Sequence, residues 1–279
     1  MTCVAVVTLV HGRRAHLEAQ HRSLALSGLR PDHYVVVAMD DPGLGPRTVT
    51  GLTRDVVHVP GDPWRLPLAA ARNRGVERAL AGGADVVVLL DVDCVAGRHL
   101  LAAAAEACVR EPAVVWSGVV TYLPEPPTGG YDLDRLEAVD DPHVARPDPG
   151  RGRELTGTDP DLFWSLCFGL SAGAWRRSGG FDERYVGYGG EDTDFGHRAV
   201  ECGLDHGVLG DARAYHQWHP VSSPPVEHLD DILRNAALFH ARWGWWPMRG
   251  WLEAFEERGL VARRGHRWVR TAPRAAAAG

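Results

Sequence analysis

Unbroken runs of apolar residues, rather than alternating ones, recur in the first third of the chain. They occupy residues 3–10 (CVAVVTLV), 33–39 (HYVVVAM) and 86–90 (VVVLL). A run without alternation is typical of a strand buried on both faces, as in a mostly parallel sheet. Between these runs, apolar residues repeat at helical spacing in 14–27 and 66–81. This alternation of strands and helices predicts a Rossmann-like, doubly wound α/β fold with a mostly parallel sheet.

The rest of the chain extends this pattern and then departs from it. Further elements are predicted in chain order at 55–60 (strand), 97–110 (helix), 113–123 (strand), 162–175 (strand with small residues), 191–202 (helix), 206–214 (strand), 227–243 and 249–258 (helices). Residues 124–160 are rich in Pro, Gly, Asp and Arg, which indicates a long loop of functional importance. We therefore expect one catalytic domain over 1–220, a Trp-rich helical extension over 221–271 and a disordered tail over 272–279.

Composition narrows the choice of partner and compartment. The chain has 279 residues, a net charge of −6 and no lysine, so binding to nucleic acid is not expected. Its five cysteines are scattered, which argues against a disulfide framework and favours a reducing, cytoplasmic setting. No signal peptide or membrane span is predicted.

Two carboxylates follow the central apolar run, in Asp91-Val92-Asp93. In a strand, side chains at i and i+2 point to the same side, and open α/β sheets bind ligands beyond the carboxyl ends of their strands. Hard oxygen ligands suit Mg²⁺ or Mn²⁺, which in turn bind phosphates. The alternative is that this common tripeptide only caps the following helix.

The loops after the other apolar strands should lie at the same edge of the sheet, because crossover connections are right-handed. They carry His11 and Asp40. An acidic residue after the second strand is suited to hydrogen-bond a nucleoside. A solvated turn is the alternative for Asp40 and Asp41, and for either residue alone it is the favoured one.

A second stretch with candidate functional residues covers residues 179–203, GGFDERYVGYGGEDTDFGHRAVECG, and is rich in glycine, aromatic and acidic residues. Glu191 and Asp192 open its predicted helix, where the helix dipole favours ionised carboxylates. A glycine-rich loop that delivers two carboxylates to a helix start can place one beside a substrate. Simple helix capping is the alternative, but the paired glycines and the aromatics favour a functional role.

Histidines and tryptophans mark the end of the chain. His216 follows the strand at 206–214 and is suited to complete a metal site with Asp91 and Asp93. An ordinary packing or surface histidine is the alternative, and a zinc site from neighbouring His and Cys residues lacks a recognisable ligand spacing. The late tryptophans favour packing between helices over a sugar-stacking or membrane-skimming face.

The motifs also occur in a recognisable order. They are Ala71-Arg72-Asn73-x-Gly75, Asp91-Val92-Asp93, Gly179-Gly180-Phe181-Asp182-Glu183, Tyr188-Gly189-Gly190-Glu191-Asp192-x-Asp194, and His216. In this order the chain resembles GT-A-fold glycosyltransferases of family 2. Its second half resembles the galactosyltransferase C-terminal module shared by animal β-1,4-galactosyltransferases and bacterial polysaccharide synthases. The resemblance covers about residues 3–220, and the GGFDE…GGEDxD block carries most of its weight.

The resemblance implies an inverting, metal-dependent hexosyltransferase that moves a sugar from a nucleotide donor, such as UDP-galactose or UDP-N-acetylhexosamine, to an acceptor hydroxyl. Mn²⁺ or Mg²⁺ would be bound by Asp93, His216 and Asp91, with His219 as a fallback ligand. The implied donor-binding residues are Thr8, His11, Asp40, Arg72, Asn73, Asp91, Val92 and Asp93. The implied acceptor-binding residues are Tyr188, Gly189, Gly190 and Glu191, and the catalytic residues are Asp192, as general base, and Glu191.

The donor sugar and the acceptor are left open by the sequence. The family often has Trp where Tyr188 stands, so the acceptor is the less certain partner: a glycan, a glycolipid, a peptide or a small molecule. Without a membrane span, contact with a lipid-linked acceptor would be peripheral.

Two other functional classes are alternatives to a glycosyltransferase. A non-catalytic carbohydrate- or nucleotide-binding relative is disfavoured by the retained carboxylates, and a metal-dependent nucleotidyltransferase by the lack of a P-loop lysine.

Overall fold

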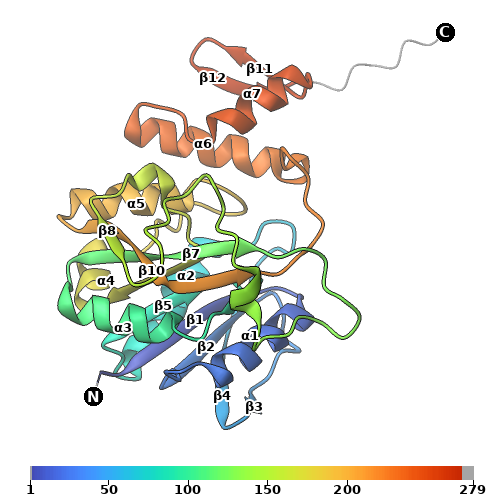
Figure 1. The fold of residues 1–279 in the computed structure, drawn as a ribbon. Coiled ribbons are helices and arrows are strands. Elements are labelled where there is room, and N and C mark those ends of the chain that lie inside the picture. Colours follow the sequence, from blue (N-terminus) through green and yellow to red (C-terminus); the bar gives the residue numbers. More distant parts are fainter. Residues whose placement is uncertain (1, 272–279) are drawn as a thin grey trace.

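The computed structural model describes residues 2–271 and has a central sheet of ten strands. The path through the sheet is β3-β4-β2-β1-β5-β9-β7-β10-β6, with β8 paired to β10 (Figure 1). The strands are β1 (Val4–Val10), β2 (His33–Met39), β3 (Arg47–Val49), β4 (Leu52–Val59), β5 (Val86–Leu90), β6 (Cys94–Ala96), β7 (Val114–Tyr122), β8 (Glu154–Thr156), β9 (Cys167–Ser171) and β10 (Asp205–His216). The predicted α/β fold is confirmed.

The sheet has a parallel half and a mixed half. Strands β4, β2, β1 and β5 are parallel neighbours, and every residue of β1 and β5 is buried, as their unbroken apolar runs predict. Next to them β9 lies antiparallel between β5 and β7, while β10 is parallel to β7. Sequence pattern alone did not predict this reversal, because an apolar run does not reveal the direction of its neighbours.

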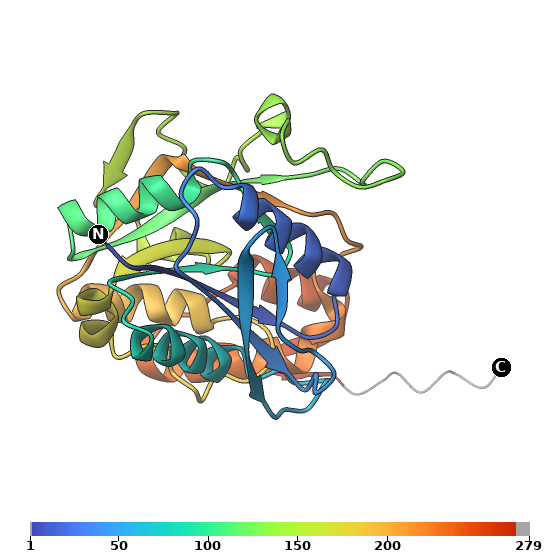
Figure 2. The same ribbon diagram turned by 90° about the horizontal axis from the view of Figure 1, so that it is seen from below.

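Helices cover both faces of the sheet (Figures 1 and 2). They are α1 (Arg14–Leu26), α2 (Leu68–Ala81), α3 (Leu100–Arg110), α4 (Ala172–Ser178), α5 (Glu191–Glu201), α6 (Leu229–Trp243) and α7 (Arg249–Glu257). Residues of α1 and α3 pack with one face of β1 and β5, whereas residues of α2, α4, α5 and α6 pack with the other. The predicted loop at 124–160 is interrupted by a 3₁₀ turn (Leu136–Val139) and by β8.

The C-terminal extension contains more than the predicted helices. After α6 and α7, strands β11 (Val261–Arg264) and β12 (Arg267–Arg270) form an antiparallel hairpin at the top of Figure 1. The expectation of an all-helical extension is therefore wrong after Glu257, where two short strands were missed. Its tryptophans make packing contacts: Trp246 stacks on His240, and Trp243 hydrogen-bonds Asp194. The tail predicted at 272–279 lies outside the described residues.

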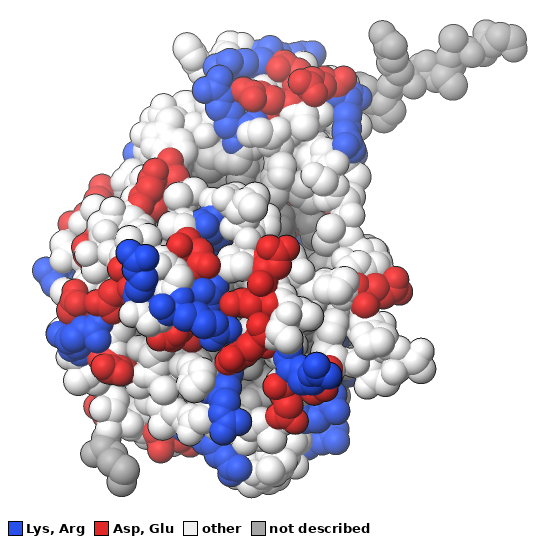
Figure 3. Space-filling model, viewed as in Figure 1, with Lys and Arg blue, Asp and Glu red and all other residues white. Residues whose placement is uncertain are grey.

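Basic and acidic side chains are interspersed on the face shown in Figure 3, and the surface is hollowed between the C-terminal extension and the body below it. Within residues 2–271, no helix combines the length and the apolar character needed to cross a bilayer.

Helix α2 approaches the sheet most closely at Gly75. A Cβ atom there would lie 2.4 Å from Cγ1 of Val7 and 2.8 Å from Cγ2 of Val37. We expect Gly75→Ala to destabilise the protein by about 1–3 kcal/mol through overpacking, although alanine is the better helix former. Gly250→Ala in α7 is the matched control, because it meets open space and should stabilise by about 0.5–1 kcal/mol. Urea unfolding measures both, and a Gly75→Ala protein as stable as the wild type would contradict the close packing.

Candidate active site

The predicted site residues meet at the carboxyl ends of β1, β2 and β5. His11, in the turn after β1, makes a hydrogen bond of 2.9 Å between its Nδ1 and the carbonyl of Met39, at the end of β2. Arg13, in the same turn, forms an ion pair of 2.5 Å with Asp93. The three loops therefore converge at one edge, as right-handed crossovers require.

Asp91 and Asp93 do not share the geometry expected of them. Strand β5 ends at Leu90, and a turn closed by a 2.8 Å hydrogen bond from the amide of Cys94 to the carbonyl of Asp91 follows. The argument that two strand residues at i and i+2 point to the same side is therefore wrong here. Asp91 lies 3.6 Å from Arg72, whereas Asp93 faces Arg13 and two histidines.

Asp93, His216 and His219 form a cluster that is suited to a divalent cation. One ligand atom from each of them lies within 4.8 Å of the others. The carboxylate of Asp93 is 3.6 Å from Nε2 of His216 and 3.5 Å from Nε2 of His219. Two imidazole nitrogens with a carboxylate oxygen fit Mn²⁺ better than Mg²⁺, which prefers oxygen ligands alone. Asp91, a predicted ligand, is not among these three residues.

The charge state of this cluster also suits a cation. Burial opposes ionisation of Asp93, but the hydrogen bond with His219 and the charges of His216 and Arg13 outweigh it and lower the pKa of Asp93. Burial lowers the pKa of His216, which keeps its imidazole neutral and able to coordinate. The ring of His216 is held by Tyr122, which stacks on it with ring centroids 4.5 Å apart. The cluster therefore offers an ionised carboxylate, which Arg13 pairs with here, and one imidazole whose ring is held in place.

Arg72 joins the two halves of the site. Its buried guanidinium lies 3.0 Å from Glu191 and 3.6 Å from Asp91, and it stands 5.1 Å over the ring of Phe181. The D-x-D turn and the start of α5 are thus connected through a single cation. The pKa of Asp91 is raised, mainly by burial and against the effect of Arg72.

Asp192 opens α5 beside this bridge. The glycines before it, Gly187, Gly189 and Gly190, all have positive φ, so the glycine-rich sequence is what allows the chain to enter the helix here. Burial and the nearby charge of Glu191 raise the pKa of Asp192 to about 6. That value lies close to neutral pH, as expected of a group that exchanges a proton during a reaction.

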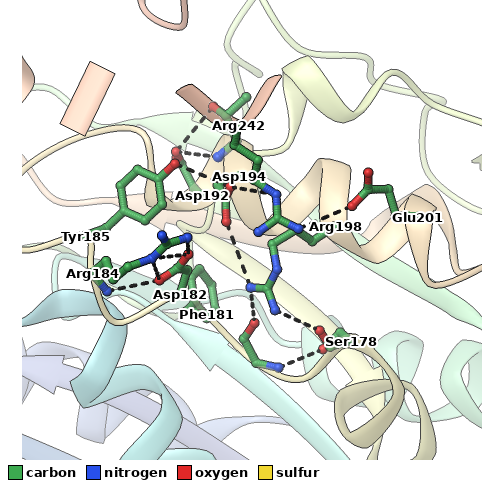
Figure 4. A network of polar contacts seen from close by, with 12 residues as sticks. Ser178, Phe181, Asp182, Arg184, Tyr185, Asp192, Asp194, Arg198, Glu201 and Arg242 are labelled. Carbon is green, nitrogen blue, oxygen red and sulfur yellow. Dashed lines mark hydrogen bonds and ion pairs between the residues drawn. The ribbon is translucent and has the colours of Figure 1, made fainter. Parts of the chain in front are cut away.

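A buried network around Asp194 fixes the position of this helix start (Figure 4). Asp194 is fully buried and accepts hydrogen bonds from Tyr185 Oη at 3.3 Å and Trp243 Nε1 at 2.9 Å. Arg198 and Arg242 each lie 3.9 Å from its carboxylate. Because Asp194 is two residues after Asp192, this network limits how far the carboxylate of Asp192 can move.

Helix α6 holds the glycine-rich loop from the other side. Asn235 donates hydrogen bonds of 3.2 Å to the carbonyls of both Val186 and Tyr188, and Asp231 accepts one from the amide of Tyr188. Tyr188 itself stacks on His228 and Trp251, with ring centroids 4.6 and 5.8 Å apart. The extension therefore shapes the predicted acceptor side of the site.

Two residues predicted to bind the donor have side chains that are already hydrogen-bonded within the protein. Thr8 is fully buried, and its hydroxyl donates to Gln20 and to the carbonyl of Leu90. It therefore stabilises the end of the sheet and presents no surface to a ligand. The side chain of Asn73 is occupied by the loop at residues 181–183: it donates to the Phe181 carbonyl and to Glu183, and accepts from the Phe181 amide. Asn73 thus fixes the backbone of the GGFDE motif by hydrogen bonds.

The other predicted residues lie at or beside the site. Asp40 is exposed at the end of β2 with φ +45°, and Val92 stands within the D-x-D turn. Sequence reasoning missed Arg13 as the partner of Asp93, and it missed Asp231 and Asn235 as supports of the glycine-rich loop. Arg13 follows a buried strand by three residues, and that position was a usable signal. Asp231 and Asn235 lie more than forty residues from Tyr188 in the sequence, and no sequence signal indicated that they contact it.

Comparisons with known proteins agree with this geometry. Residues 159–220 match the family model described as the N-terminal domain of galactosyltransferase. Validoxylamine A glucosyltransferase of Streptomyces hygroscopicus subsp. limoneus is 30% identical over 229 residues, which is 72% of this chain and 48% of the relative. N-acetylglucosaminyl-diphospho-decaprenol L-rhamnosyltransferase of Mycobacterium tuberculosis (strain CDC 1551 / Oshkosh) is 31% identical over 131 residues, 44% of this chain and 41% of the relative. The chain spans about half the length of these curated relatives, or less.

Solved structures share the fold. GalNAc-T7 with UDP, GalNAc and Mn²⁺ superimposes with a TM-score of 0.55 at 15% identity, over 86% of this chain and 50% of that one. Residues 1–349 of S. aureus TarS give a TM-score of 0.55 at 14% identity, over 85% of this chain and 65% of that one. The resemblance found in the motifs and the GT-A fold are both confirmed.

Proposed function

We propose that this chain, a relative of glycosyltransferases with the GT-A fold, moves a hexose from a UDP-sugar to an acceptor hydroxyl and inverts the anomeric configuration. The observation that carries the proposal is the pairing of two clusters across Arg72. The set of Asp93, His216 and His219 lies on one side, and Asp192 beside Glu191 lies on the other. The relatives named for glucosyl and rhamnosyl transfer support the reaction class. The neighbour that contains UDP and Mn²⁺ supports the donor and the ion.

We assign the nucleotide to the edge formed by His11, Asp40 and Asp93. Asp40, at the end of β2, would meet the base, and Asp93 with His216 and His219 would hold Mn²⁺ or Mg²⁺ against the diphosphate. When bound, the ion supplies positive charge that stabilises the departing diphosphate. Asp91 and Arg72 would then orient the donor sugar, since they lie between the cation cluster and α5.

We assign proton transfer to Asp192. Its carboxylate takes the proton from the acceptor hydroxyl as that oxygen attacks the anomeric carbon from the face opposite the leaving group. One displacement gives inversion, through a transition state like that of glycoside hydrolysis. Glu191 remains paired with Arg72 and keeps it in place, while Tyr188, Gly189 and Gly190 would line the acceptor side.

We further propose the boundary of the catalytic domain at residue 220, with the extension as a support for the acceptor loop. The scattered free cysteines favour a cytoplasmic location, and a lipid-linked acceptor would be reached by peripheral contact with the membrane.

The rate of transfer should fall in mildly acidic solution. Asp192 must be ionised to accept a proton, and its pKa is raised to about 6. Below that pH the ionised fraction drops about tenfold per pH unit, so kcat at pH 5 should be about a tenth of its plateau value. A pH profile of kcat measures this, with circular dichroism at each pH to show that the fold is retained. A flat profile from pH 7 to pH 5 would contradict the assignment of the base.

The direct test of the function is a donor screen. The purified protein would be incubated with UDP-glucose, UDP-galactose, UDP-N-acetylglucosamine, GDP-mannose and dTDP-rhamnose, each with Mn²⁺ and each with EDTA. With no acceptor added, the sugar is transferred to water, and the nucleotide released by this slow hydrolysis would be measured. We expect release from a UDP-hexose only with the ion. Tight binding of a nucleotide without release or transfer would instead indicate a non-catalytic relative, and pyrophosphate chemistry would indicate a nucleotidyltransferase.

A further inference from the structure

The hairpin of β11 and β12 concentrates positive charge at one end of the molecule. Residues 258–271, which contain it, hold five of the 30 arginines and none of the 36 acidic residues. The body of the protein is correspondingly acidic, and the net charge of the whole chain is −6. Arg263, Arg264 and Arg267, next to the turn of the hairpin, are all exposed, and we call them the arginine tip. Figure 3 shows basic side chains along the outer edge of the extension.

The protein itself does not neutralise the arginine tip. Within residues 2–271, no carboxylate forms an ion pair with any of the three arginines, whereas Arg270, at the base of the hairpin, pairs with Asp230 of α6. Glu256 of neighbouring α7 contacts the hairpin, but it accepts its hydrogen bond from the backbone amide of Arg263. The guanidinium of Arg263 stands 5.8 Å over the ring of Trp268. The charge of the arginine tip is therefore open to an external partner.

Two of these arginines oppose each other across the hairpin. Arg264 and Arg267 are direct cross-strand partners on either side of the turn. Like charges at directly opposite positions destabilise a sheet, and a two-stranded hairpin has little stability of its own. This hairpin is held through Val261, which is buried, and Trp268, both of which pack in one apolar cluster with residues of α6 and α7. An anionic surface would remove the repulsion between the two arginines.

The size of the arginine tip and the charge of the body favour a membrane as that partner. A specific protein interface covers about 800 Å² on each partner, which is far more than three side chains around a turn provide. A membrane with anionic lipids attracts individual basic side chains and requires no complementary shape. The same membrane would repel the acidic body, so the arginine tip would be the part that touches it.

We propose that the arginine tip docks this protein on a membrane surface that contains anionic lipids. The contact itself does not depend on the proposed function, but its use rests on it, because the contact would bring the acceptor side of the site to a lipid-linked acceptor. The acceptor side lies close to the hairpin. Trp251 of α7 stacks on Tyr188 and packs in the same apolar cluster as Val261 and Trp268 of the hairpin.

Binding of the full chain to vesicles tests the proposal. Flotation would compare vesicles of phosphatidylcholine alone with vesicles of equal parts phosphatidylcholine and phosphatidylglycerol, at low and at high salt. The wild type should bind the anionic vesicles at least about tenfold more tightly at low salt, and salt should weaken this binding. A variant that combines Arg264→Gln and Arg267→Gln should bind them about tenfold to thirtyfold more weakly, since each basic residue near an anionic membrane contributes about fivefold.

A variant that combines Arg176→Gln and Arg177→Gln is the charge-matched control, because it removes two exposed arginines from α4 in the body of the protein, and it should bind as the wild type does. An equal loss in this control, or no loss in the hairpin variant, would overturn the proposal.

Two results with the wild type would also overturn it. Equal binding to neutral and anionic vesicles would leave the arginines as charges that keep the edges of the hairpin from pairing with another chain. Tighter binding to a DNA duplex than to anionic vesicles would make nucleic acid the partner. Binding of UDP with Mn²⁺ is measured on the same proteins and should be unchanged by either pair of substitutions. Its absence from the wild type would refute the proposed function, and the vesicle result would still decide the role of the arginine tip.

Discussion

Replacing Asp93 with alanine should abolish the Mn²⁺-dependent binding of UDP, with a loss of affinity of at least about 100-fold. The variant removes the one carboxylate of the cation cluster and leaves only the imidazoles of His216 and His219 beside Arg13, whose positive charge repels a divalent ion. Without the ion, the diphosphate loses its main source of positive charge at this edge of the sheet. Titration of UDP in Mn²⁺ and in EDTA measures the effect directly.

Asp55→Ala is the matched control for that experiment. Asp55, on β4, forms an exposed ion pair with Arg78 of α2, and pairs of this kind contribute little to stability. The Asp55→Ala variant should bind UDP as the wild type does, and the dependence of binding on Mn²⁺ should be unchanged. If Asp93→Ala folded normally and still bound UDP only with Mn²⁺, the cation cluster would be assigned to the wrong residues.

Replacing Asp192 with asparagine should lower kcat by about 10²- to 10⁴-fold, the usual contribution of a general base. Asparagine keeps the size of the side chain and its hydrogen bond to the amide of Thr193, which is 2.8 Å long in the structure, but it cannot take a proton. Because Asp192 is separate from the cation cluster, the affinity for UDP in Mn²⁺ should be nearly unchanged. Steady-state kinetics and UDP titration together distinguish a lost base from a lost binding site.

Glu201→Gln supplies the comparison on the same helix. Glu201 lies in the last turn of α5 and pairs with Arg242 at the surface, so its loss should leave kcat within about twofold. The variant tests whether any change of charge on α5 lowers the rate. Normal turnover by Asp192→Asn would transfer the role of base to another group, and the acid limb of the pH profile would then need a different origin.

The parallel half of the sheet could be predicted because its residues are buried on both faces. Strands β1, β2 and β5 coincide with unbroken apolar runs, and polar residues such as His11, Asp40 and Asp91 mark the end of each run. The antiparallel course of β9 could not be predicted in this way. Direction depends on pairing between distant segments, such as Leu90 with Cys167, and a local pattern does not contain that information.

The sequence predicted which residues form the site, but it did not predict how their side chains are placed relative to one another. The motif Asp91-Val92-Asp93 was found, but the turn after β5 separates its two carboxylates, so that one faces Arg72 and the other faces His216 and His219. Thr8 and Asn73 were assigned to the donor through the family resemblance. Their hydroxyl and amide groups are used instead to satisfy buried partners. Whether a polar side chain is free to bind depends on such contacts, which sequence alone does not show.

A crystal grown with Mn²⁺ and UDP, and measured for the anomalous signal of manganese, tests the central claim most directly. We expect one strong peak between Asp93 and at least one of His216 and His219, next to density for the diphosphate. The peak would also decide which histidine coordinates the ion and whether Arg13 moves away from Asp93. Manganese bound elsewhere, or UDP bound at the strand ends with no metal beside Asp93, would contradict the account.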